Sequence, residues 1–215
     1  MQGPQFASAP PTANCTTGVS YQYSCTATGA PPPAFTVTSG ALPDGLTISS
    51  AGVISGTPTV VGTFSGTITA TNGTSPDATQ SFTITISTAL QSWRQSYFGT
   101  TANTGTAADS AVSNLDGLPN LLEYALGGTP TVANRDIPPK LGTVINGGGT
   151  YLTLTFTPQS PDITYAIEVS GNLNGAWTSI PLAGLLTMGQ AYTHTDTVAV
   201  SSGAPRFLRL RVSGQ

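Results

Sequence analysis

The sequence predicts a mainly β protein, built from two small β-sandwiches that are joined by a short helical connector. Three observations support this fold class. The chain contains 36 Thr, 21 Ser, 25 Gly and 17 Pro among 215 residues, a composition typical of many short strands and tight turns. Apolar residues alternate with polar ones in segments on both sides of the chain's middle, and only the middle carries helix-capping patterns.

The first β-rich part has its clearest alternation near its end. Residues 63–71 and 82–86 place apolar side chains on one face and threonines on the other, with a turn cluster at residues 72–76. Shorter strands are expected over residues 19–25, from Phe35 onward and over residues 46–48. Strands separated by turns at this spacing predict a sandwich.

Three motifs in this part carry a resemblance. They are LPDGL at residues 42–46, GVISGTP at residues 52–58 and GTF at residues 62–64, followed by ATN at residues 70–72. With these motifs, residues 15–88 resemble the immunoglobulin-like repeats of bacterial surface proteins, which are also described as cadherin-like. The resemblance implies a Greek-key sandwich that serves as a spacer or adhesion module, outside the cell.

The domain organisation follows from these patterns. Residues 1–14 are rich in Pro and Ala and predict an extended N-terminal arm. Residues 15–88 form the first sandwich, residues 89–135 the helical connector, and residues 136–215 a second sandwich of fibronectin-like size.

The connector predicts two helices. Over residues 87–99, Leu90, Trp93 and Tyr97 share one face and Gly99 ends the helix. A second helix over residues 118–126 has Pro119 in its first turn and stops at Gly127. We expect the two helices to pack on each other.

The segment before the second helix has the spacing of a calcium loop. If Glu123 is position 12, Gly117 falls at position 6, and oxygen-bearing side chains fall at positions 3, 5 and 9, namely Asn114, Asp116 and Asn120. Position 1 is Val112, so Asp109 would have to supply the missing ligand. The segment resembles dockerin-like and thrombospondin type 3-like calcium repeats at Asp116, Gly117, Asn120, Glu123 and Tyr124. Two interpretations stay open, a capped helix without metal and a Ca²⁺ site.

The second β-rich part begins with a hairpin over residues 141–156, whose turn is glycine-rich. Residues 163–169 place four apolar side chains on one face, residues 176–180 form a shorter strand, and residues 207–212 bury their apolar side chains and expose two arginines. Trp177 and Tyr165 fit either the core or an aromatic platform for sugars.

Cys15 and Cys25 are the only cysteines. They predict a disulfide and an oxidising compartment, and closing so short a loop would stabilise the fold by roughly 2–3 kcal/mol. The alternative is two buried free thiols.

Several functions are excluded by composition. With six basic residues and a net charge of −3, the chain lacks the charge for binding nucleic acid, and no apolar run is long enough to span a membrane. The one base–carboxylate pair, His194 and Asp196, is expected to be a solvent-exposed pair on a strand. No catalytic motif accompanies it, so no catalytic residue is predicted.

We therefore expect an extracellular or cell-surface structural or adhesion protein that is not an enzyme. It would associate with itself or with other surface proteins or glycans, and one form of this is a fibre assembled by strand exchange with residues 1–14 as donor. The alternatives are a carbohydrate-binding accessory module of a secreted enzyme and a calcium-dependent docking or adhesion module. No cofactor other than Ca²⁺ is expected.

Overall fold

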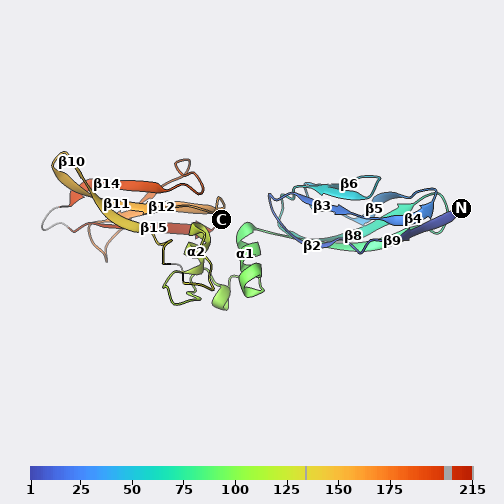
Figure 1. Ribbon diagram of the computed structural model, residues 1–215, viewed down its shortest axis with the longest axis horizontal. Coiled ribbons are helices and arrows are strands. Elements are labelled where there is room, and N and C mark those ends of the chain that lie inside the picture. The colour runs from blue at the N-terminus through green and yellow to red at the C-terminus, as the bar shows by residue number, and fades with distance from the viewer. Residues whose placement is uncertain (134, 201–204, 215) are drawn as a thin grey trace. The chain divides into compact units, whose positions relative to one another are not determined.

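The computed structural model describes residues 1–133, 135–200 and 205–214. They divide into two compact units, residues 1–92 and 93–215. Both units consist mainly of antiparallel strands, with two short α-helices near the middle of the chain (Figure 1). The predicted mainly β class is confirmed.

Unit 1 holds nine strands, β1 Gln2–Phe6, β2 Thr12–Thr16, β3 Tyr21–Ser24, β4 Ala27–Ala30, β5 Ala34–Gly40, β6 Leu46–Ile48, β7 Val53–Gly56, β8 Gly62–Thr71 and β9 Ala78–Ser87. A four-stranded sheet has the order β2-β9-β8-β5, a three-stranded sheet has the order β3-β7-β6, and β1 pairs with β4. Strand β2 runs parallel to β9, and the other pairs are antiparallel.

The core of unit 1 lies where the alternating pattern predicts it. Phe82, Ile84 and Ile86 of β9 are buried, and they pack with Ile68 of β8 and Ile54 of β7 in one apolar cluster. Each such side chain is worth about 1.5–3 kcal/mol when fully buried, so this strand pattern is the main stabilising feature of the unit.

The motif glycines of unit 1 are explained by close backbone approach. Gly45 has φ +91°, and a Cβ placed on it would lie 2.0 Å from the carbonyl oxygen of Thr57. Gly56 has φ +139°, and its Cβ would lie 2.0 Å from the carbonyl oxygen of Gly45. Only glycine fits both the left-handed conformation and the space.

The N-terminal segment differs from the expected free arm. Residues 2–6 form β1, which pairs with β4, and residues 12–16 form β2, which joins the four-stranded sheet beside β9. Phe6 also contacts the ring of Phe35 at a centroid distance of 5.8 Å. The segment lacks alternation, but its backbone donors and acceptors find partners at strands that need a neighbour.

Unit 2 begins within helix α1, Ala89–Phe98, after Ser92. It continues with a 3₁₀ turn at Gly105–Ala107, helix α2 Asn120–Leu126, and strands β10 Lys140–Asn146, β11 Gly149–Phe156, β12 Ile163–Ser170, β13 Thr178–Pro181, β14 Tyr192–Val200 and β15 Phe207–Gly214. The sheets have the orders β10-β11-β14 and β13-β12-β15.

Helix α2 belongs to the core of unit 2. Its Ala125 and Leu126 are buried in one cluster with Leu154, Ile163 and Ile167 of the strands. The helix begins at Asn120, two residues later than expected, because Asp116 Oδ1 accepts the Leu118 N–H in the turn before it. The helix ends at Gly127, as predicted, with φ +79°.

The predicted packing between the two helices is confirmed within unit 2. The ring of Trp93 in α1 meets the ring of Tyr124 in α2 edge-to-face at 5.6 Å, and Tyr97 lies 5.2 Å from Trp93. The aromatic face of the first helix is therefore a packing surface. Among the described residues, no helix is long and apolar enough to cross a membrane.

Candidate functional site

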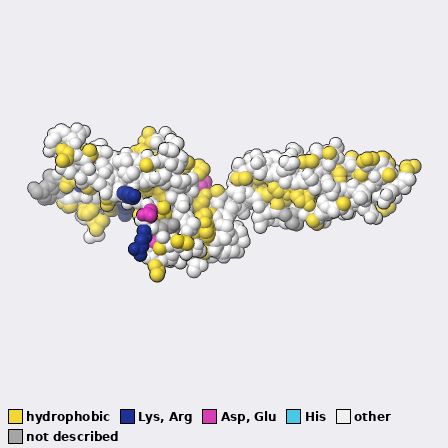
Figure 2. Space-filling view, viewed as in Figure 1, with side chains coloured by type: hydrophobic (Ala, Val, Ile, Leu, Met, Phe, Trp, Pro, Cys, Tyr) yellow, Lys and Arg dark blue, Asp and Glu magenta, His cyan; other side chains and the backbone are white. Residues whose placement is uncertain are grey.

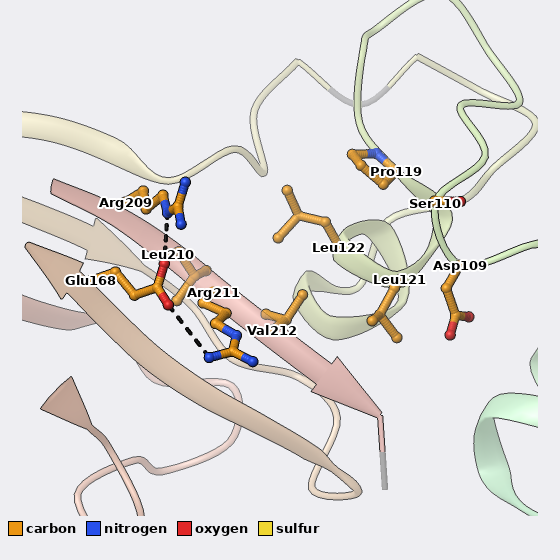
Figure 3. Close-up of a pocket in the computed structure, with 10 residues that line it drawn as sticks. All are labelled: Asp109, Ser110, Pro119, Leu121, Leu122, Glu168, Arg209, Leu210, Arg211 and Val212. Carbon is orange, nitrogen blue, oxygen red and sulfur yellow. Dashed lines mark hydrogen bonds and ion pairs between the residues drawn. The ribbon is translucent and has the colours of Figure 1, made fainter. Parts of the chain in front are cut away.

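A groove of about 580 Å³ lies in unit 2 between helix α2 and strand β15 (Figure 3). Pro119, Leu121 and Leu122 form the wall on the helix side, and residues 209–212 form the wall on the strand side. Asp109, Ser110 and Glu168 complete the lining.

The groove runs along an open sheet edge. Strand β15 is the outer strand of the sheet β13-β12-β15, and four consecutive residues of it line the groove, so side chains from both faces of the strand reach the opening. Leu210 and Val212 supply apolar surface opposite Leu121 and Leu122. An open strand edge opposite an apolar helix face can accept an extended chain as an added strand.

One side of the groove is charged. The carboxylate of Glu168, whose side chain is 8% exposed, accepts hydrogen bonds from Arg209 Nε at 2.6 Å and from Arg211 at 3.4 Å. Both arginines are more than half exposed, so water screens much of this attraction. The alternation places the two arginines outward, as predicted, and the carboxylate between them.

The expected aromatic platform is not formed. Tyr165 is buried in the core, stacked on Phe156 at 5.8 Å, and its hydroxyl hydrogen-bonds with backbone groups of Ser160 and Ala125. The face of Trp177 carries the guanidinium of Arg209, 4.1 Å from the ring centroid. Tyr165 is thus a core residue, and Trp177 forms a cation–π contact.

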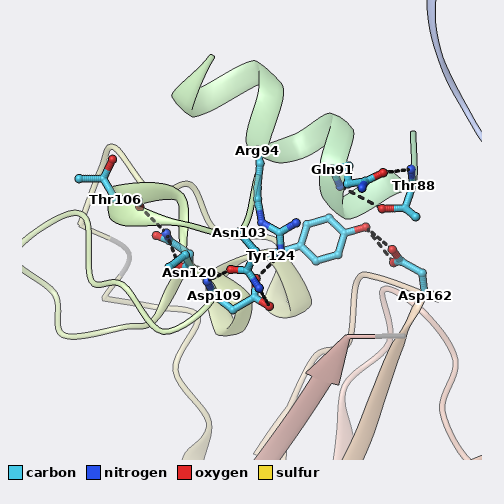
Figure 4. A network of polar contacts seen from close by, with 10 residues as sticks. Thr88, Gln91, Arg94, Asn103, Thr106, Asp109, Asn120, Tyr124 and Asp162 are labelled. Atoms are coloured by element: carbon cyan, nitrogen blue, oxygen red, sulfur yellow. Dashed lines mark hydrogen bonds and ion pairs between the residues drawn. The ribbon is translucent and has the colours of Figure 1, made fainter. Parts of the chain in front are cut away.

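A polar network fixes the segment before α2 (Figure 4). Buried Arg94 pairs with Asp109 Oδ1, and Asn103 Nδ2 donates to Asp109 Oδ2 at 2.9 Å. The Asp109 N–H donates to Asn103 Oδ1 at 2.7 Å. Both carboxylate oxygens of Asp109 are therefore occupied by protein donors, and Asp109 does not join the other predicted calcium ligands.

Asn120 anchors the first turn of α2. Its side chain is 1% exposed, and Nδ2 donates to the carbonyl oxygens of Thr106 and Ala108, each at 2.8 Å. Oδ1 of Asn120 is buried and has no hydrogen-bond partner within the described ranges.

The remaining predicted ligands are neighbours. Asn114 Nδ2 donates to Glu123 Oε1 at 2.9 Å, and Asn114 Oδ1 accepts the Asp116 N–H at 2.9 Å. Glu123 is completely buried. The part of the chain that the structure describes contains no cluster of three or more His, Cys, Asp or Glu side chains suited to a metal.

The predicted disulfide is not formed in this structure, because both cysteines are free. Cys15 lies in β2 of one sheet, and Cys25 follows β3 of the other sheet, where its N–H donates to Gly52. Burial raises the pKa of both thiols. Burial, followed by the charges of both thiols and of Tyr23, raises the pKa of Tyr21 to about 12, which places both cysteines near one side chain.

The pair His194 and Asp196 is not solvent-exposed as predicted. Asp196 is 3% exposed and forms a bidentate pair with Arg206. Burial alone would raise the pKa of Asp196, but hydrogen bonds from Arg206 and the Val198 N–H lower it. Burial lowers the pKa of His194, against the opposing effect of Asp196, and Nε2 of His194 has no partner among the described residues. The carboxylate is thus committed to an arginine.

The ion pairs escaped the sequence analysis. Glu168 and Arg209 are 41 residues apart, and they meet because β12 and β15 pair in the register Glu168↔Arg209. The available signal was the charge-poor composition, in which each of the six basic residues needs an explanation.

Comparisons with known proteins identify one part of the chain. The family model described as "Putative Ig domain" matches residues 3–87. These residues therefore form an immunoglobulin-like repeat, as the motifs predicted. A search of curated proteins found no match.

Three solved structures illustrate the likeness. A Bacteroides fragilis protein described as a putative alpha-galactosidase/melibiase is 24% identical with a TM-score of 0.35, and the match covers 40% of this chain and 18% of that chain. The titin M3 domain is 20% identical with a TM-score of 0.33, covering 40% and 98%. Sidekick-1 immunoglobulin domains 1–5 are 12% identical with a TM-score of 0.39, covering 97% and 38%.

Proposed function

We propose that the chain is a non-enzymatic structural or adhesion protein that works outside the cell and assembles by strand addition. The observation that carries the proposal is the groove along the open edge of β15. Backbone donors and acceptors at such an edge bind an extended segment, and Leu121, Leu122 and Leu210 offer contacts for its side chains.

The composition supports an extracellular setting. Lys, Arg, Asp and Glu make up 7% of the residues, and 57 of 215 residues are Thr or Ser. On the face seen in Figure 2, charged side chains are few. The immunoglobulin-like repeat in residues 3–87 is a structural and adhesion type of module.

The donor that we propose is the first strand of a second copy. Strand β1 lies in a separate two-stranded sheet, and its register with β4 shifts between Gln2 and Gln5. It is therefore the strand of unit 1 that leaves its partner most easily, whereas β2 is part of the four-stranded sheet. A donor and an acceptor at different places on the chain make a head-to-tail contact, which produces filaments when it does not close into a ring.

Two variants test the groove and one tests the donor. Leu122→Glu places a charge in the groove and should abolish assembly, and Leu115→Glu, at a fully exposed loop position, is the matched control. Deletion of residues 1–6 should also abolish assembly while β2 to β9 stay folded, as circular dichroism can verify. Assembly by the Leu122→Glu protein at the level of the Leu115→Glu protein would remove the groove from the mechanism.

A calcium-dependent role is a second candidate, favoured by the buried Asn120 Oδ1 and the buried Glu123 carboxylate in one segment. A hard cation binds such oxygens, and Asn114, Asp116, Asn120 and Glu123 would hold it, with backbone carbonyls or water. Calcium should then raise the melting temperature and a chelator should lower it. Identical melting curves with calcium and with chelator would eliminate this role.

A further inference from the structure

Strand β10 is an unusual edge strand. It is the outer strand of the sheet β10-β11-β14, and all seven of its residues are exposed. Its only contact of any extent in the described chain is with β11. Leu141 is 65% exposed and Ile145 78% exposed, although both lie on the face of the sheet that carries the buried Leu154.

This edge lacks the usual protection against pairing. Proteins block open edges with charges, prolines or bulges. Strand β10 contains one charge, Lys140 at its first position, and no proline, and its seven pairs with β11 run from Lys140 to Asn146 without a register shift. The neighbouring pair of β11 with β14 does contain a shift.

The hairpin geometry shows which backbone groups point outward. Gly147 and Gly148 both have positive φ, so they form a two-residue turn of type I′, flanked by the pair Asn146–Gly149. That flanking pair is hydrogen-bonded, and bonded and non-bonded pairs alternate from there along the hairpin. The N–H and C=O groups of Leu141, Thr143 and Ile145 therefore point away from β11, toward the open edge.

These groups are complementary to themselves. When two copies of β10 pair antiparallel about a two-fold axis at Thr143, Thr143 faces its own counterpart and Leu141 faces Ile145 of the other copy. Every outward N–H then meets an outward C=O, and the apolar side chains of both copies share one face. Lys140 lies opposite Asn146, whereas a parallel arrangement would set the two lysines side by side.

We propose that β10 is a two-fold self-association edge, through which two copies of this chain form one continuous six-stranded sheet. The contact goes beyond the proposed function and does not depend on the β15 groove or on filament formation. Seven residues a side is well below the roughly 20–30 of a stable interface, so the contact is weak in an isolated pair. It gains strength where several copies are held together.

Sedimentation equilibrium of the full chain tests the proposal. We expect the weight-average mass of the wild type to rise by about 1.5-fold or more between roughly 10 µM and 1 mM, since small interfaces give weak association. Thr143→Pro removes an outward N–H without affecting the bonds to β11 and should stay monomeric, and Thr143→Val should associate like the wild type.

A second pair of variants covers a folding defect in the proline variant. Ile145→Lys should be monomeric, whereas Val198→Lys, at a half-exposed position of β14 on the other edge of the same sheet, should associate normally. A monomeric wild type at 1 mM would overturn the proposal, as would equal association of the Ile145→Lys and Val198→Lys proteins. Loss of the β15 groove in Leu122→Glu should leave this association unchanged, which separates the two contacts.

Discussion

The hydroxyl of Tyr165 donates a hydrogen bond of 2.7 Å to the carbonyl oxygen of Ala125, 40 residues earlier in the chain. This bond joins strand β12 to the last turn of α2 and so fixes the helix that walls the groove. The same hydroxyl accepts the Ser160 N–H at 3.2 Å.

Tyr165→Phe should therefore destabilise unit 2 by about 1–2 kcal/mol, because the ring still packs but buried polar groups lose a partner. Chemical denaturation monitored by Trp177 fluorescence measures the change. A matched control is Tyr151→Phe, since Tyr151 is partly exposed on β11. An equal effect of both substitutions would contradict the role of the bond.

Gly45→Ala should cost at least about 2 kcal/mol of stability in unit 1, because a positive φ and a clash with the Thr57 carbonyl oxygen act together. Gly18→Ala is the control, since Gly18 also has positive φ but nothing within 4 Å of a Cβ. Thermal unfolding compares the two variants, and a control that loses as much stability as Gly45→Ala would show that the clash has no effect.

The stability of unit 2 should fall with pH below about 6.5, the usual pKa of histidine. Burial lowers the pKa of His194 in the folded state, so the unfolded chain takes up the proton first and stability is lost as the pH falls. His194→Gln should flatten the melting temperature between pH 7.5 and 5. The Asp196–Arg206 pair does not interfere, because its carboxylate protonates only at lower pH. A wild-type melting temperature that is constant over this interval would contradict the prediction.

Protein isolated from an oxidising compartment should carry a disulfide between Cys15 and Cys25. Both thiols pack against the same apolar cluster of unit 1 and both act on Tyr21. Alkylation followed by mass spectrometry should find no free thiol before reduction and two after it, and reduction should cost roughly 2–3 kcal/mol. Two free thiols in protein from its native source would leave the cysteines as core residues.

The sequence predicted those elements whose causes are local. Alternation identified β8, β9, β12 and β15, and the two glycines after Asn146 identified the hairpin turn. Gly127 marked the end of α2 correctly. Each of these signals lies within ten residues, where side-chain periodicity and backbone preference act directly.

The features that depend on register were not predictable. Nothing in the Pro- and Ala-rich segment 1–14 indicates that β2 runs parallel to β9, about 70 residues away. The partners Arg94 of Asp109 and Arg206 of Asp196 also follow from tertiary packing. The groove exists because α2 leaves the edge of β15 uncovered, which is a property of the assembled unit.

Negative-stain electron microscopy of the protein from its native source tests the proposed function most directly. We predict regular filaments, with wild-type chains linked through the β15 groove and a Leu122→Glu protein that forms none. Separate, unassembled particles at all concentrations would contradict a structural subunit and would leave a spacer or binding module.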